Sequence, residues 1–250
     1  MGAQRPDPRR AGDPWVARAG RWIRSDSFCH LHLVLLFTLL VVQPLRRFEV
    51  YEQFLAHVTL VAVMASGVVA VGRVRWRMPV AAALASPMLL LGFGTTAPSS
   101  GQAVVGLATG GLFMGFCSAC LLIDLFRERR VEGGMISKAL SAYIMLGLTW
   151  SFAYAMLSGV DPEAIRGLAP FDPGSASGRL GSFLYFSLIT MTTVGYGDVT
   201  PVTDEARALV MLQALAGQIV LVVLVARLVG MQVATSMTSE RGAGGDRPGG

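Results

Sequence analysis

Long apolar stretches separated by short polar segments run through most of the chain. A helix needs about 20 mostly apolar residues to cross the hydrocarbon core of a bilayer. Stretches that reach or approach this length are predicted at 28–45, 54–71, 79–93, 103–125, 137–157 and 208–231. The third stretch is short and contains Pro87. The pattern predicts an all-α membrane protein with six transmembrane helices.

A further apolar stretch, residues 181–193, is too short to cross a bilayer and is predicted to be re-entrant. Re-entrant backbone is tolerated where it is buried in protein or lines a water-filled cavity. The composition agrees with a membrane protein, because 53% of the residues are apolar and only 15% are charged. A soluble domain usually carries about 25% charged residues.

The basic residues predict how the chain sits in the membrane. Most of the 21 Lys and Arg residues precede the first stretch, follow the last, or lie between stretches two and three or four and five. By the positive-inside rule both termini are cytoplasmic, in the plasma (cytoplasmic) membrane. The net charge of +5 is therefore assigned to orientation and to contact with membrane lipids, and not to nucleic acid. The basic amino terminus lacks the core and cleavage site of a signal peptide.

The most specific motif is the run TTVGYGD at residues 192–198, which lies between the last two long apolar stretches. Carbonyl oxygens that all face one axis need a backbone alternating between right- and left-handed regions. Glycine reaches positive φ without steric cost, and Gly195 and Gly197 lie two residues apart, as the alternation requires. Val194 and Tyr196 occupy the intervening positions, where their side chains are expected to point away from the axis and pack behind it.

Polar residues flank the glycine-containing part of the motif. Thr193 can add a hydroxyl oxygen to its carbonyl at the inner end. Asp198 is expected just outside the narrow part, where it accepts hydrogen bonds from its surroundings and keeps the mouth negative.

Residues 192–198 resemble the selectivity filter of the potassium-channel family, in which carbonyls from four TVGYG loops coordinate the ion. The resemblance covers the pore module firmly. It implies a filter made of Thr193, Val194, Gly195, Tyr196 and Gly197, with K⁺ held by the backbone carbonyls of the first four. Thr192 and Asp198 are the implied supports, and 181–193 is the implied pore helix. Because the chain holds one copy of the motif, the resemblance implies a homotetramer with the pore on its fourfold axis.

The last apolar stretch is predicted to line the inner pore. Gly217 lies where this family often has a hinge glycine, and both a hinge and a close-packing role are open. Gln218 is interpreted as the lone strongly polar residue of this helix, and it shares a face with Leu221 and Val225. Gln218 either contacts hydrated ions in a cavity or hydrogen-bonds a neighbouring helix. A hydrophobic gate at Val225 or Val229 is a further hypothesis.

Five segments are predicted. They are a basic cytoplasmic segment (1–27), a four-helix domain (28–125), a cytoplasmic linker (126–136), a pore domain (137–233) and a disordered cytoplasmic tail without a regulatory domain (234–250). The four-helix domain has the position of a voltage sensor. Its fourth stretch, however, has no Lys or Arg before Arg127, and Arg77 is assigned to a loop. Little intrinsic voltage dependence is expected, because one charge gains only about 2.3 kcal/mol per 100 mV.

Other candidate chemistry is weak. Cys29, Cys117 and Cys120 are interpreted as small apolar residues, and His30 and His32 as interfacial side chains. No catalytic set or phosphate loop is apparent, so neither an enzyme nor a cofactor is expected beyond K⁺ as the permeant ion. The prediction is a potassium-selective channel. The alternatives are a weakly selective cation channel, against which Tyr196 argues, a non-conducting modulatory subunit and a potassium-transporter subunit.

Overall fold

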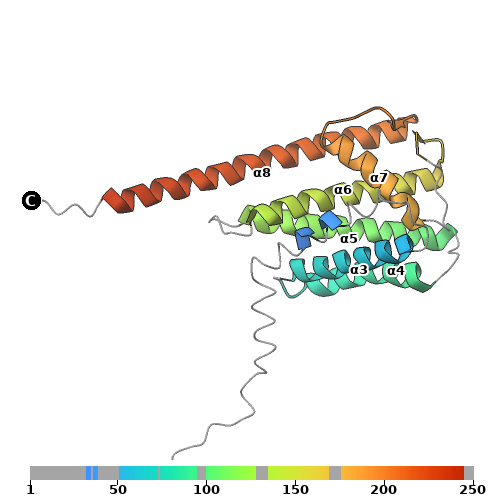
Figure 1. Cartoon of the computed structure of the whole chain (residues 1–250), viewed down its shortest axis with the longest axis horizontal. Coiled ribbons are helices and arrows are strands. Elements are labelled where there is room, and N and C mark those ends of the chain that lie inside the picture. Colours follow the sequence, from blue (N-terminus) through green and yellow to red (C-terminus); the bar gives the residue numbers. More distant parts are fainter. Residues whose placement is uncertain are drawn as a thin grey trace, which may run out of the picture.

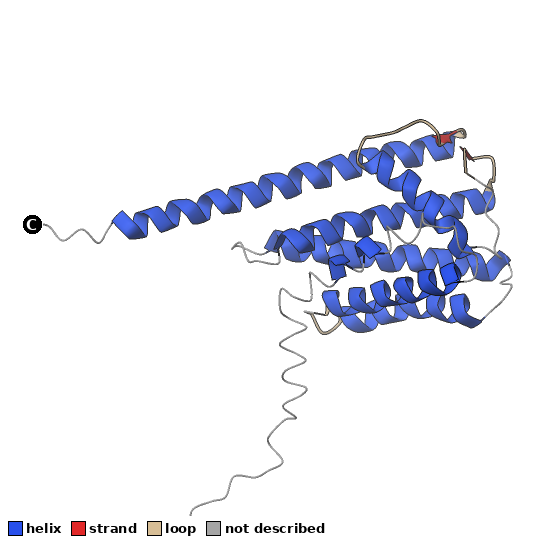
Figure 2. Cartoon of the chain, viewed as in Figure 1, coloured by secondary structure: helices blue, strands red, loops and turns tan. Residues whose placement is uncertain are grey.

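The computed structural model describes residues 32–34, 36–38, 51–72, 74–94, 100–127, 135–168 and 176–244. Within these residues the long elements are nearly all helical (Figure 1, Figure 2). They are α3 (Tyr51–Val71), α4 (Arg77–Gly94), α5 (Ser100–Arg127), α6 (Met135–Val160), α7 (Ala176–Met191) and α8 (Asp204–Gly244). Two short antiparallel strands, β1 (Ile165–Arg166) and β2 (Thr200–Pro201), lie on either side of α7 in sequence.

These helices cover all the predicted apolar stretches except the first. Three have the length and composition to cross a membrane: Val104–Arg127, Met135–Val160 and Asp204–Gly230. Shorter apolar helices occupy Leu60–Val71, Arg77–Leu90 and Leu180–Met191. The helix α4 continues through Pro87. The predicted stretch 28–45 lies mostly outside the described residues, as do 128–134 of the predicted linker.

The helix α5 packs along α6 through a seam of small residues. A Cβ added at Gly111 would stand 3.0 Å from the Phe152 Cβ, and one at Gly115 would stand 3.3 Å from the Thr149 Cγ2. The Ser118 hydroxyl donates to the carbonyl oxygen of Ala142 at 2.9 Å. Small residues let helix backbones approach closely in membranes. The fourth predicted stretch is therefore held firmly against the helix that begins the pore module.

The assignment of Arg77 to a loop is wrong. Arg77 is the first residue of α4, and its guanidinium donates to both carboxylate oxygens of Asp124 on α5, at 2.8 and 2.9 Å. The two side chains are 5% and 16% exposed. A buried charge needs such a partner, because an unpaired one is costly to desolvate. The pair ties the start of α4 to the end of α5.

His32 was expected to be interfacial, and this prediction is also wrong. It is buried, with its Nδ1 2.7 Å from the Ser66 hydroxyl oxygen and its Nε2 3.4 Å from the Met145 sulfur. It therefore connects the first helical segment to α3 and α6. A polar side chain at membrane depth is better satisfied by neighbouring helices than by lipid.

The helix α8 is longer than predicted. It runs over 41 residues to Gly244 and extends beyond the other helices in Figure 1. The predicted disordered tail therefore does not begin at residue 234. Residues 232–241 contain neither Gly nor Pro, so nothing in the sequence stops a helix that is already formed. Residues 245–250 lie outside the described part of the chain.

The middle of α8 is attached to the end of α5. Leu224 packs in a small cluster with Leu125, Met135 and Ala139. The Arg227 side chain donates to the carbonyl oxygens of Leu125 at 3.1 Å and Phe126 at 2.7 Å. The last carbonyls of a helix have no partner within it, and a cation there also meets the negative end of the helix dipole. Arg227 therefore caps α5.

Candidate functional site

The C-terminal end of α7 is capped by the loop that follows it. The amide of Thr193 donates to the carbonyl oxygen of Thr190 at 3.0 Å. The amides of Val194 and Gly195 both donate to the carbonyl oxygen of Ile189, at 2.9 and 3.1 Å. These contacts pair carbonyls that a helix end would otherwise leave free. The amides of Thr193, Val194 and Gly195 are committed to α7, so these residues can offer an ion their carbonyl oxygens.

The backbone of the motif alternates in handedness, as predicted. Positive φ angles occur at Thr193 (62°), Gly195 (47°) and Gly197 (80°). An added Cβ at Gly195 or Gly197 would meet nothing within 4 Å, so their backbone conformation, and not lack of space, requires glycine. Thr193 adopts the left-handed region despite its branched Cβ, which is unusual and costs energy.

The end of α7 also has an electrostatic consequence. A helix carries the equivalent of about half a negative charge at its C-terminus, which favours a nearby cation. Tyr143 on α6 fixes the end of α7, because its hydroxyl donates to the carbonyl oxygen of Met191 at 3.0 Å. The motif therefore begins where both the carbonyls and the helix dipole favour positive charge.

Asp198 is held at the other end of the motif. It accepts a hydrogen bond from the Tyr185 hydroxyl at 2.8 Å and from the Val199 amide at 3.1 Å. The expectation that Asp198 accepts hydrogen bonds from its surroundings is confirmed. The bond to Asp198 raises the pKa of the Tyr185 phenol, because it favours the protonated donor. The sequence interpretation missed Tyr185, although it is a hydroxyl-bearing aromatic in the short helix before the motif.

The loop before α7 is held beside Asp198. In the β1–β2 pair, Ile165 lies opposite Pro201 and Arg166 lies opposite Thr200. Next to the pair, Gly167 has a φ of 89°, and its Cα lies so close to the Asp198 carbonyl oxygen that a Cβ would collide with it. The loop before α7 is thus fixed to the segment that leaves the motif. Residues 169–175, which include Asp172, lie outside the described residues.

The side chains of Val194 and Tyr196 are not packed within one chain. They are 52% and 73% exposed, respectively. The expectation that they pack behind the motif is therefore not met by the described residues of this chain, whose helices do not cover them. Large apolar and aromatic side chains left exposed together often mark a contact surface.

On α8, Gly217 lies against the end of α7. An added Cβ would stand 2.5 Å from the Met191 Cγ and 3.3 Å from the Met191 carbonyl oxygen. This close approach supports a packing role. Gln218, Leu221 and Val225 are exposed on the single chain, as is Val229.

Gln218 is not the lone strongly polar residue of α8. Gln213 lies one and a half turns earlier and is completely buried, with hydrogen bonds to α6 and α7. The polarity of Gln213 within an apolar run was the signal available in the sequence, since glutamine in a membrane helix usually hydrogen-bonds a neighbouring helix. Within the described residues Cys117 and Cys120 are free and buried.

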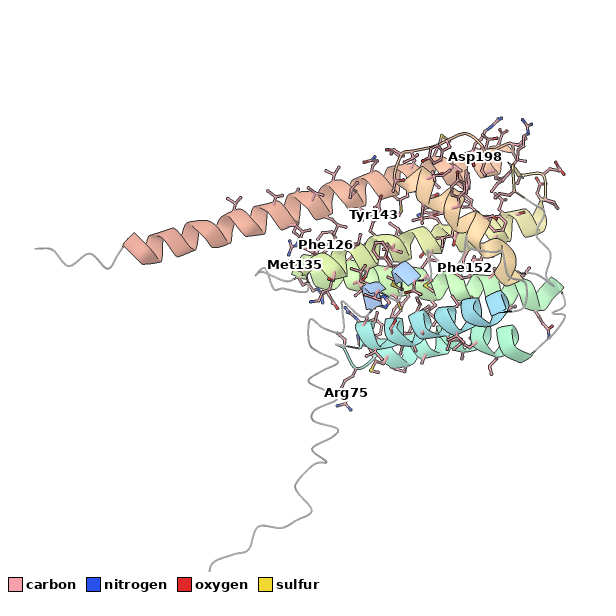
Figure 3. All side chains as sticks on the ribbon, in the orientation of Figure 1. Arg75, Phe126, Met135, Tyr143, Phe152 and Asp198 are labelled. Atoms are coloured by element: carbon pink, nitrogen blue, oxygen red, sulfur yellow. The ribbon has the colours of Figure 1, made fainter. Side chains whose placement is uncertain are left out.

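The two ends of the helix bundle can be told apart by the residues labelled in Figure 3. Arg75, Phe126 and Met135 lie toward one end of the bundle, and Asp198 lies toward the opposite end. The motif therefore lies far from the basic ends of α4 and α5.

Comparison with known proteins agrees with this geometry. A family described as "Ion channel" matches residues 142–233, which include the motif and both flanking helices. Residues 142–233 therefore resemble an ion-channel pore domain. A protein of Oryza sativa subsp. japonica named "Two pore potassium channel a" is 29% identical over 105 residues. No solved structure matches this chain significantly.

The match has a limited extent. It covers 42% of this chain and 26% of the rice protein, so the chain corresponds to about a quarter of that relative's length. The chain is a multi-pass membrane protein with a region that is similar to an ion-channel family. The family that residues 142–233 match is one of ion channels and not of enzymes.

Proposed function

We propose that this chain is the subunit of a potassium-selective channel that conducts K⁺ passively through residues 193–197. The observation that carries the proposal is the regular alternation of positive φ at Thr193, Gly195 and Gly197, directly after the C-terminus of a short helix. That backbone can direct successive carbonyl oxygens of Thr193, Val194, Gly195 and Tyr196 toward one axis. In a potassium filter such oxygens replace the hydration shell of the ion.

The mechanism is one of exchange between water and carbonyl ligands. A K⁺ ion loses its water on reaching the filter and binds between successive rings of carbonyls. A second ion that arrives displaces the first by repulsion, and the displaced ion is rehydrated on leaving. Asp198, held by Tyr185, supplies negative charge at the outer mouth, and Thr192 and Thr193 support the inner end.

A homotetramer would cover surfaces that a single chain leaves exposed. One filter strand cannot surround an ion, and closed cyclic symmetry is the usual way to supply the others. The exposed side chains of Val194 and Tyr196 would then pack against neighbouring copies behind the filter. Much of α8 is also exposed and apolar, including Met211, Leu215 and Ile219. Such a face needs a neighbouring copy or lipid to cover it.

The proposed topology has six spans, with α7 re-entrant and both termini cytoplasmic. The basic residues at one end of α4 and α5, and Asp198 toward the other, support this orientation. On α8, Gln218 and Leu221 would face the cavity, and Val225 or Val229 would narrow its inner mouth. Gly217 would act in packing, with a hinge role as the alternative.

Little intrinsic voltage dependence is part of the proposal. Between Ser100 and Phe126, α5 has no Lys or Arg, and its small-residue face is closely packed on α6. A sensor helix needs several charges and freedom to move, because each charge gains only about 2.3 kcal/mol per 100 mV. We expect the four-helix domain to stay fixed to the pore domain when the voltage changes.

Recording from the purified full chain in planar bilayers tests the proposal. With K⁺ and Na⁺ on opposite sides, we expect a reversal potential near that of K⁺ and a shallow conductance–voltage relation. A reversal potential near zero would favour the weakly selective cation channel. Absence of K⁺ flux from liposomes containing only this chain would favour a modulatory subunit, and a steep voltage dependence would refute the fixed-domain argument.

A further inference from the structure

A buried chain of hydrogen bonds crosses from α6 to α8 at the level of α7. The Tyr154 hydroxyl on α6 donates to Oε1 of Gln213 on α8. Nε2 of Gln213 donates to the Ser187 hydroxyl oxygen at 2.7 Å and to the Ser187 carbonyl oxygen at 2.9 Å. The Ser187 hydroxyl in turn donates to the carbonyl oxygen of Gly147 on α6 at 2.7 Å.

The three side chains in this hydrogen-bond network, Tyr154, Ser187 and Gln213, are completely buried. Gln213 has one amide oxygen and one amide nitrogen, and both have protein partners. Sliding or rotating α8 against α7 would break these bonds together and leave buried polar groups without water to replace them. Of the other contacts of α8 described above, those at Gly217 and Leu224 are apolar, and the hydrogen bonds of Arg227 go to α5 and not to α7. Apolar contacts are non-directional, whereas hydrogen bonds fix both distance and angle.

Ser187, the residue of α7 that hydrogen-bonds Gln213, lies next to the residues of α7 that hold the motif. Ser187 directly precedes Leu188 and Ile189, whose carbonyl oxygens accept from the amides of Thr192 and Val194 at 2.9 Å each. Two residues before Ser187, Tyr185 holds Asp198. A displacement of α7 at Ser187 would therefore move the supports at both ends of the motif.

We propose that Gln213 is a positioning residue for the filter. It fixes α7 between α6 and α8, and so keeps residues 193–197 in the conformation that coordinates ions. Movement of α8 is transmitted to the filter through Gln213 instead of being absorbed by apolar contacts. This inference rests on the proposed potassium-channel function.

The test uses the full chain in planar bilayers with three variants. Gln213→Leu removes the side chain's hydrogen bonds, and Tyr154→Phe removes only one of them with little change in volume. Ser151→Ala is the matched control, because Ser151 is equally buried but its hydroxyl bonds only within α6, to Leu148 at 2.7 Å. The readouts are the decay of K⁺ current during sustained conduction, at low and high external K⁺, and the free energy of unfolding in detergent.

We expect the current to decay about tenfold faster in Gln213→Leu and about threefold faster in Tyr154→Phe, with Ser151→Ala like the wild type. High external K⁺ should slow the decay, because an ion bound to the intact filter stabilises it by mass action. If Gln213→Leu does not fold, Tyr154→Phe carries the same expectation.

The double variant Tyr154→Phe/Gln213→Leu separates lost positioning from mere instability. It removes the Tyr154 hydroxyl that Gln213→Leu leaves without an acceptor, while the Ser187 hydroxyl keeps its bond to the Gly147 carbonyl oxygen. We therefore expect stability to recover in part while the fast decay persists. Recovery of both, or wild-type decay in the single variants, would overturn the inference and leave the channel function intact. A wild-type chain that gives no K⁺ flux would overturn both.

Discussion

Substitution of Gly217 by Ala tests whether this residue serves close packing of α8 or acts as a hinge within it. The new Cβ would stand 2.5 Å from the Met191 Cγ. Carbon atoms in good contact are about 3.5–4.0 Å apart, so Met191 must move by about 1 Å or more. Met191 is completely buried at the end of α7, where the Cγ is close to the backbone and not at the free end of the side chain. The strain therefore reaches the residue that precedes the motif.

The expected magnitude combines two opposing terms. Replacing a helix-interior glycine by alanine gains about 1 kcal/mol of helix propensity. Overpacking a well-filled interior costs about 1–3 kcal/mol. We expect Gly217→Ala to destabilise the protein by about 0–2 kcal/mol and to lower K⁺ conduction. Met191→Ala alone should cost about 2–5 kcal/mol through the cavity it leaves.

The double variant Met191→Ala/Gly217→Ala is decisive, because the added methyl then fills part of the vacated volume. We expect the two changes together to cost at least 1 kcal/mol less than the sum of their separate effects, in the range typical of contacting residues. The free energy of unfolding in mixed micelles and the single-channel open probability measure this. Additive costs to within about 0.5 kcal/mol, with the conduction defect unchanged in the double variant, would refute packing and favour the hinge.

Three further substitutions test other contacts. Asp124→Asn leaves the buried Arg77 charge without its partner and should cost about 3 kcal/mol or more of stability. The double variant Arg77→Met/Asp124→Leu should recover most of that loss. A thermal unfolding curve unchanged by Asp124→Asn would contradict this. Arg227→Leu exposes the last carbonyls of α5 and should cost about 1–2 kcal/mol by chemical unfolding, with the exposed Arg75→Leu as a near-neutral control. Gly195→Ala strains a left-handed backbone by about 1–2 kcal/mol and should reduce K⁺ over Na⁺ selectivity, and an unshifted reversal potential would count against the proposed filter.

The sequence predicted the helices well because each long apolar stretch has one low-energy solution in lipid, a helix that pairs its own backbone. The handedness of the motif was also predictable, since Gly195 and Gly197 permit what most residues resist. These features depend on local chemistry alone.

The contacts between helices were not predictable in the same way. A polar residue such as Gln213 or His32 in an apolar run implies that it has a partner, but the partner depends on how each helix is rotated. Asp124 and Arg77 illustrate the same limit, because they are 47 residues apart and meet only through the packing of α4 on α5. The end of α8 was mispredicted for a different reason. Polar residues were interpreted as disorder, although nothing in them ends a helix.

The strand pair beside Asp198 also offers a way to observe the filter. Arg166 is exposed on β1, and its partner Thr200 follows Asp198 by two residues. The backbone at Arg166 lies one strand spacing, about 4.8 Å, from the backbone that leaves the motif, so a fluorescent or spin label attached through Arg166→Cys would be close to that segment. The described cysteines Cys117 and Cys120 are buried and would compete poorly for the reagent. The loop before α7 therefore provides a labelling site that would report rearrangements of the proposed ion pathway without altering a side chain within it.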